Sequence, residues 1–196
     1  MKKYIFYIGL IIAALLITSC KKDDADPTSE IWKQWNEQAF NDLSQNPDFT
    51  ELWIEGNRVN SIYYRVIQKG EGKRLFYNSR AEIYFKGWYV VTHADINIKE
   101  GDVFDQQLFD DGVTWKVAVS AQSMDANYVY VYENEGWKVA LQHMVEGDIW
   151  EIRIPYQLGY GSLDQKTRYG YGRTVFAYST LAFEIEVVKA IDPDEF

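Results

Sequence analysis

The strongest constraint on the fold is a strict alternation between apolar and acidic residues near the end of the chain. Between Thr180 and Ile191 the sequence is TLAFEIEVVKAI. Apolar side chains fall on one face of an extended strand and glutamates on the other: Leu181, Phe183, Ile185 and Val187 against Glu184 and Glu186. Because the side chains of a strand point alternately to opposite faces, this pattern predicts a half-buried strand of an antiparallel sheet. Another layer of the fold must then cover one face of that sheet.

Further segments rich in β-branched and aromatic residues predict partner strands for this one. They are 61–67, 80–91, 115–119 and 148–154. The segment 136–144 instead has Trp137, Ala140, Leu141 and Met144 at helical spacing, which predicts a short helix. The whole pattern predicts an α+β domain in which an antiparallel sheet is packed on that helix.

A second helix is expected at 30–44, ahead of the first strand. Ser29 can serve as its N-cap, and Asn46-Pro47 would end it. Its expected apolar stripe comprises Ile31, Trp32, Trp35, Ala39, Phe40 and Leu43. We therefore expect an N-terminal helical extension at 30–57, followed by the main domain at 58–196.

The N-terminus has the pattern of an export signal. Lys2 and Lys3 precede the uncharged segment 4–16, which is shorter than the roughly 20 residues that a spanning helix needs. Ile17-Thr18-Ser19-Cys20 resembles the lipobox of bacterial lipoproteins, in which the cysteine thiol receives a diacylglycerol. This resemblance implies a signal peptide at 1–19 and a lipidated Cys20, the only cysteine of the chain. The alternative is an uncleaved amphipathic anchor with an incidental cysteine.

The residues after Cys20 bear on the location of the domain. The polar segment 20–29 predicts a flexible tether behind the lipidated cysteine. Within it, Lys21-Lys22-Asp23-Asp24 resembles the surface-export signal of some Gram-negative lipoproteins. We expect an outer membrane lipoprotein whose domain is exposed at the cell surface if this resemblance holds. If the charges only solvate the tether, the domain lies on the periplasmic side.

Composition argues against two classes of partner. The formal net charge is -9, and no basic cluster exceeds Lys21-Lys22 or Lys73-Arg74, so we expect no nucleic-acid partner. His93 and His143 are far apart and have no neighbouring cysteines, so we expect no metal site.

Several motifs occur in the order in which one enzyme family has them. They are YYRVIQKGEGKR at 63–74, EIYFKGWYV at 82–90, GDVFDQQ at 101–107, GWKVALQHMVEGDIWEIRIP at 136–155, YQLGYGS at 156–162 and TLAFEIEVVKAI at 180–191. Together they resemble the FKBP-type peptidyl-prolyl isomerases over roughly residues 61–191. The resemblance implies an FKBP-like antiparallel sheet wrapped around one short helix. It also implies proline-containing polypeptides, such as folding envelope or secreted proteins, as substrates.

The implied reaction requires no cofactor. Rotation about an X-Pro bond breaks amide resonance, and the catalyst needs an apolar, aromatic-walled pocket and a few hydrogen bonds that favour the twisted amide. The implied catalytic residues are Asp105, Tyr160 and Trp137, with Trp137 as the floor of the pocket. The implied substrate-binding residues are Phe85, Phe104, Trp115, Val175 and Phe183.

Some positions depart from the family pattern. Phe85 stands where the family has a tyrosine, so a hydroxyl near Asp105 is missing unless Tyr84 shifts into its place. The two positions before Gly136, where the family has an aliphatic pair, are Asn134 and Glu135, with Glu133 before them. The segment 173–178 lacks the prolines that the family has there.

These departures leave two functions open. The retained aromatic residues favour an isomerase. We expect its activity to be weak, because Phe85 lacks the hydroxyl that the family has near Asp105. The tyrosine-rich segments 128–132 and 169–178 favour a catalytically weak or inactive module that binds a peptide, a protein partner or a glycan. Trp137 and Phe183 could also be ordinary core residues.

Overall fold

A computed structural model describes residues 27–54, 56, 60–130, 134–167 and 173–195. The predicted signal peptide, Cys20 and most of the predicted tether lie outside the described residues. Within the described part of the chain, no helix is long and apolar enough to cross a membrane.

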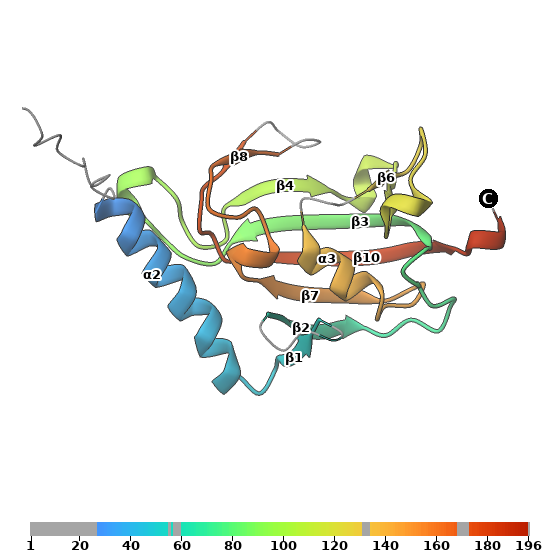
Figure 1. Ribbon diagram of the computed structural model, residues 1–196, viewed down its shortest axis with the longest axis horizontal. Helices are drawn as coiled ribbons and strands as arrows, with labels where there is room; N and C mark the ends of the chain where they lie inside the picture. The colour runs from blue at the N-terminus through green and yellow to red at the C-terminus, as the bar shows by residue number, and fades with distance from the viewer. Residues whose placement is uncertain (1–26, 55, 57–59, 131–133, 168–172, 196) are drawn as a thin grey trace, which may run out of the picture.

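The architecture is a sheet with one short helix against it, as predicted, and the sheet is antiparallel except for the strand pair at one edge (Figure 1). Strand β10 (Leu181–Ile191) lies at the centre, between β3 (Arg80–Tyr89) and β7 (Ile149–Ile154). The order across the sheet is β1-β2-β7-β10-β3-β5-β6. The remaining bounds are β1 Thr50–Trp53, β2 Ser61–Gln68, β5 Trp115–Ala118 and β6 Val129–Tyr130.

Each predicted strand is confirmed, and the structure adds shorter ones. Strand β4 (Val103–Gln107) pairs with β3, and β8 (Gln165–Lys166) pairs with β9 (Thr174–Val175) as a separate ribbon. None of these has an alternating pattern long enough to predict it from sequence. The short strand β1, inside the expected helical extension, pairs with β2.

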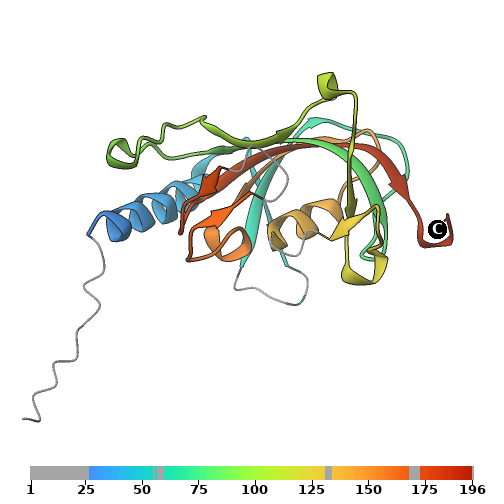
Figure 2. The same cartoon turned by 90° about the horizontal axis from the view of Figure 1, so that it is seen from above.

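The predicted short helix is α3 (Glu135–Leu141), which lies on the concave side of the curved sheet (Figure 2). It begins one residue earlier than predicted and ends three residues earlier. Asn134 caps it by accepting a hydrogen bond from the Trp137 N–H at 3.2 Å. A Cβ on Gly136 would lie 2.6 Å from Cγ2 of Ile154, so only glycine allows α3 to approach β7 this closely.

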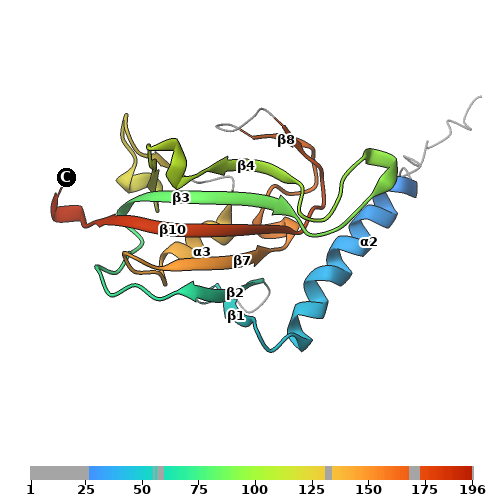
Figure 3. The same cartoon turned by 180° about the vertical axis from the view of Figure 1, so that it is seen from behind.

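The N-terminal helix α2 (Pro27–Asn41) continues into the 3-10 turn Asp42–Gln45 and lies beside the end of the sheet (Figure 3). Two details of the prediction were wrong. The helix begins at Pro27, so Ser29 lies in its first turn rather than at the cap, in keeping with the preference of proline for that turn. Of the expected apolar stripe, Trp32 is buried, but Ile31 and Trp35 are 43% and 47% exposed.

Candidate functional site

The centre of the site is a cluster of aromatic rings, to which we refer as the aromatic cluster. It consists of Phe85, Phe104, Trp115, Trp137, Tyr160 and Phe183. Trp137 of α3 lies in the middle, 3% exposed, with edge-on contacts to rings from three different strands. Its ring centroid is 5.1 Å from Phe85, 5.4 Å from Trp115 and 5.1 Å from Phe183.

The cluster continues from β10 to β4 and to the loop after β7. Phe104 is 1% exposed and meets Phe183 edge-on at 5.5 Å and Tyr160 at 6.2 Å. Tyr160 is half-buried, and Val175 of β9 is fully buried in the same hydrophobic core. The structure therefore brings seven of the eight predicted residues into one hydrophobic core, with six of them joined by a continuous chain of ring contacts. The eighth, Asp105, directly follows Phe104 on β4.

A glycine and a bulge explain how these rings meet. In the sheet register Gly87 pairs with both Phe183 and Asp105. A Cβ on Gly87 would lie 2.6 Å from Cε1 of Phe183 and 2.8 Å from Cζ of Phe104, so the glycine leaves the space that the two rings fill. The β3–β4 register shifts after Gly87, which is a β-bulge at Phe104. The extra residue lets the consecutive Phe104 and Asp105 both be buried.

Asp105 is the titratable group of this region. Its carboxylate is buried, with the residue 6% exposed, and accepts a hydrogen bond from the Gln106 N–H at 3.0 Å. Burial raises the pKa of Asp105 from 3.8 to about 6, and the Gln106 bond offsets only part of this rise. Asp105 is therefore mostly ionised at neutral pH, which makes it a buried negative charge near the aromatic cluster.

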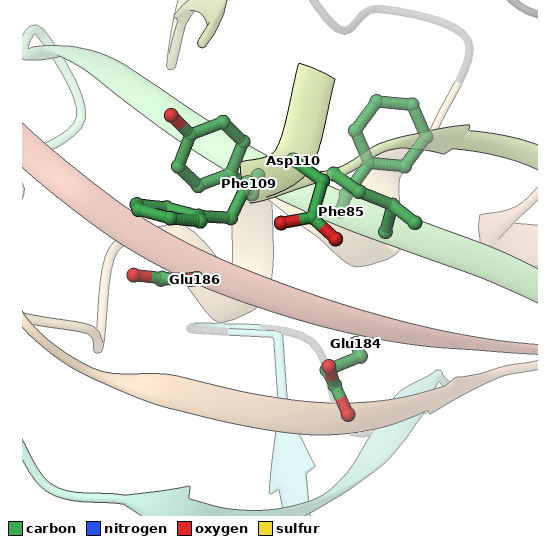
Figure 4. A pocket seen from close by; sticks show the side chains of 7 residues that line it. Phe85, Phe109, Asp110, Glu184 and Glu186 are labelled. Carbon is green, nitrogen blue, oxygen red and sulfur yellow. The ribbon is translucent and has the colours of Figure 1, made fainter. Parts of the chain in front are cut away.

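Tyr84 does not replace the hydroxyl that Phe85 lacks. Consecutive residues of β3 face opposite sides of the sheet, and Phe85 faces the aromatic cluster. The Tyr84 ring instead meets Phe109 edge-on at 5.6 Å on the outer face. There it lines a hollow of about 210 Å³ together with acidic side chains, including Glu184 and Glu186 (Figure 4). The alternative in which Tyr84 shifts toward Asp105 is therefore wrong.

Sequence reasoning missed Tyr89, the last residue of β3. It is 4% exposed, and its ring meets Phe104 at 5.4 Å. Its hydroxyl donates to the Thr174 carbonyl at 2.9 Å and accepts from the Phe176 N–H at 3.3 Å. Burial raises its pKa to about 12. Its position could have been found from strand parity, because Tyr89 shares a face with Phe85 and Gly87.

One buried hydrogen-bond donor of the site lacks a partner among the described residues. The indole N–H of Trp137 is buried and has no acceptor within the described part of the chain. Among the described residues, no three His, Cys, Asp or Glu side chains are grouped as metal ligands would be.

Both the sequence and the fold are similar to those of known proteins. Residues 84–188 match the family model of the FKBP-type peptidyl-prolyl cis-trans isomerases. The chain is 28% identical over 132 residues to a macrophage infectivity potentiator of Trypanosoma cruzi, covering 67% of this chain and 54% of that protein. It is 27% identical over 130 residues to the FKBP-type 22 kDa peptidyl-prolyl cis-trans isomerase of Escherichia coli K12, covering 66% and 50%. The chain thus spans about half the length of these relatives.

Two crystal structures show the same fold at low sequence identity. A peptidyl-prolyl cis-trans isomerase from Pseudomonas syringae pv. tomato superposes with a TM-score of 0.59 at 22% identity, covering 85% of this chain and 98% of that one. FkpA from Escherichia coli gives a TM-score of 0.57 at 16% identity, covering 83% and 61%.

Proposed function

The chain belongs to the FKBP-type peptidyl-prolyl cis-trans isomerase family, and from that premise we propose that it catalyses cis-trans isomerisation of X-Pro bonds in polypeptides. The observation that carries the proposal is the aromatic cluster around Trp137, with the buried carboxylate of Asp105 near it. The proline ring would bind against Trp137, with Phe85, Phe104, Trp115, Val175 and Phe183 as apolar walls.

Such a site lowers the barrier by favouring the twisted amide. The planar amide is polar and is stabilised by water, and its rotation costs about 18–20 kcal/mol. A site that removes water from the amide and binds the twisted state better gains tenfold in rate for each ~1.4 kcal/mol of preference. No bond is broken, so no nucleophile takes part.

The two polar residues would have different roles, Asp105 on the twisting amide and Tyr160 on the bound peptide. When resonance is lost, the carbonyl carbon becomes more positive. The ionised carboxylate of Asp105 would stabilise that charge. The Tyr160 hydroxyl would donate a hydrogen bond to a substrate carbonyl and hold the peptide in place. Phe85 cannot orient Asp105 through a hydrogen bond, which costs about 1 kcal/mol, or less than tenfold in rate. We therefore expect measurable but weak activity.

The test is exchange spectroscopy of an Ala-Leu-Pro-Phe peptide with the full chain in detergent micelles. Cis-trans exchange should be faster than in buffer, and Trp137→Ala should lose most of the acceleration. Trp53→Ala is the matched control, because Trp53 is 43% exposed on β1 and has no part in the aromatic cluster. Exchange no faster than in buffer would refute the proposal. A peptide that binds without exchanging would support the alternative binding module.

We further propose that the protein is an outer membrane lipoprotein anchored through Cys20. A single cysteine placed directly after an apolar segment and before a polar tether supports this proposal. Its clients would then be envelope or secreted polypeptides. Radioactive palmitate should label the protein, and Cys20→Ala should abolish the label; a labelled Ala variant would contradict lipidation at this residue.

Exposure at the cell surface is a separate proposal, supported by Lys21-Lys22-Asp23-Asp24. Protease added to intact cells should remove the domain. Protection in intact cells, together with cleavage after lysis, would place the domain on the periplasmic side instead.

A further inference from the structure

Helix α2 holds a loop of the site through two buried side chains. Trp32 and Asn36 lie one turn apart on the helix and are 3% and 0% exposed. Both face the loop between β9 and β10, residues 176–180, which we call the last loop. The Trp32 indole N–H donates to the Ala177 carbonyl at 2.9 Å. The Asn36 side chain accepts from the Thr180 N–H at 2.7 Å, and the Asn36 backbone carbonyl accepts from the Thr180 hydroxyl at 2.8 Å.

The last loop is also held by Tyr89 of β3. The Tyr89 hydroxyl bonds both the Thr174 carbonyl and the Phe176 N–H, as described above. The Trp32 ring meets the Tyr89 ring edge-on, with centroids 6.3 Å apart. The last loop contains no proline that would restrict its backbone. These contacts with α2 and β3 therefore help to fix its conformation, together with the hydrogen bond that the Ala177 N–H donates to the Asp164 carboxylate at 2.8 Å.

One residue of the last loop has a strained backbone conformation, which surrounding contacts must hold in place. Tyr178 has φ of 61°, a left-handed conformation that is unfavourable for a residue with a side chain. The Lys33 ammonium of α2 lies 5.5 Å from the centre of its ring. The Tyr178 N–H donates to the Gly161 carbonyl at 2.9 Å. That bond joins the last loop to the loop that carries Tyr160.

From these contacts we infer that Trp32 and Asn36 are positioning residues of the prolyl site. By holding the last loop, they set the place of Val175 and, through Gly161, of Tyr160. Ordering this loop before the peptide arrives removes an entropic cost from binding. The inference rests on the proposed isomerase function and concerns affinity for the peptide, because neither side chain belongs to the aromatic cluster.

The test compares two variants with two matched controls on the same helix, in the full chain in detergent micelles. Trp32→Phe keeps a ring but removes the donor to Ala177, and Asn36→Ala removes the acceptor for Thr180. Trp35→Phe and Asn41→Ala change the same residue types at exposed positions. Peptide exchange is measured against peptide concentration at a temperature where every variant is fully folded.

We expect each variant to raise KM roughly threefold to tenfold, the effect of losing about one hydrogen bond, with a smaller change in kcat. The controls should stay within about twofold of the wild-type KM, as expected of exposed positions. A merely structural role would behave differently: at this temperature a loss of stability alone would leave both KM and kcat unchanged, and at higher temperature it would lower the folded fraction and so kcat, but not KM. Unchanged KM in both variants would overturn the inference.

Amide hydrogen exchange gives a readout that does not depend on activity. The Thr180 amide should exchange about tenfold faster in Asn36→Ala than in wild type or Asn41→Ala, since its buried acceptor is gone. Equal exchange rates would overturn the inference. If the wild-type chain binds the peptide without turnover, the proposed function fails. Weaker peptide binding in Trp32→Phe and Asn36→Ala would then still support the positioning role, and unchanged binding would refute it.

Discussion

Replacing Asp105 with asparagine should make the protein more stable at neutral pH and less active. The buried carboxylate of Asp105 has its pKa raised by burial from 3.8 to about 6. The folded state therefore binds this proton more tightly than the unfolded state does. Wild-type stability falls as the pH rises from about 4 to about 6, because the folded protein must then keep a buried charge. Asparagine has nearly the same shape, still accepts the Gln106 N–H, and never ionises.

The size of the effect follows from the pKa. A rise of about two pKa units corresponds to about 3 kcal/mol of stability at ~1.36 kcal/mol per unit. Above pH 7, Asp105→Asn should therefore be up to about 3 kcal/mol more stable than wild type. Well below the unfolded-state pKa of 3.8 the carboxyl group is neutral in both the folded and the unfolded wild-type protein, so most of the difference should already be gone at pH 3.5.

Urea unfolding at pH 3.5 and at pH 7.5 measures this difference. Asp110→Asn is the matched control, because it removes the same charge from an exposed aspartate. Equal or lower stability of Asp105→Asn at pH 7.5 would refute the reasoning about burial. Isomerase activity should move the other way: lower in Asp105→Asn at pH 7.5, and in wild type declining as the pH falls through about 6. A variant that is more stable yet less active would separate the role of Asp105 in the site from any role in folding.

Three further changes test other parts of the structure. Gly87→Ala should lower the free energy of unfolding in urea by roughly 2 kcal/mol and weaken peptide binding, because its Cβ would overlap the Phe183 ring. Lys86→Ala, on the other face of β3, should change neither quantity. Tyr160→Phe should slow peptide exchange by up to about tenfold, the effect of one hydrogen bond, and leave the melting temperature within a few degrees; unchanged exchange would remove Tyr160 from the mechanism. Deleting 27–45 should lower the melting temperature, since it exposes the surface that Trp32 covers; an unchanged value would make α2 an independent spacer.

Some features of the site could be predicted because they depend on local pattern. Strand parity places Phe183 and Phe85 on the face that is covered, and helical spacing places Trp137 on the buried side of α3. The order of the motifs assigns these residues to one family, and the structure brings them together. Such patterns are local because the periods of 2.0 and 3.6 residues are properties of the backbone itself.

Other features depended on segments that are distant in the chain. Asn36 and Thr180 are separated by 144 residues, and nothing in either segment indicates that they bond. Asp105 acquires its pKa of about 6 only when surrounding segments exclude water from it. The helical pattern of α2 was evident, yet it could not show that Trp32 would be buried and Trp35 exposed, because a broad apolar stripe allows more than one rotation. The sequence alone therefore determined the longer strands and the two helices, the buried faces of β3, β10 and α3, and the family. Only the packing of distant segments decided which polar groups are buried, which partners they find and how the last loop is held.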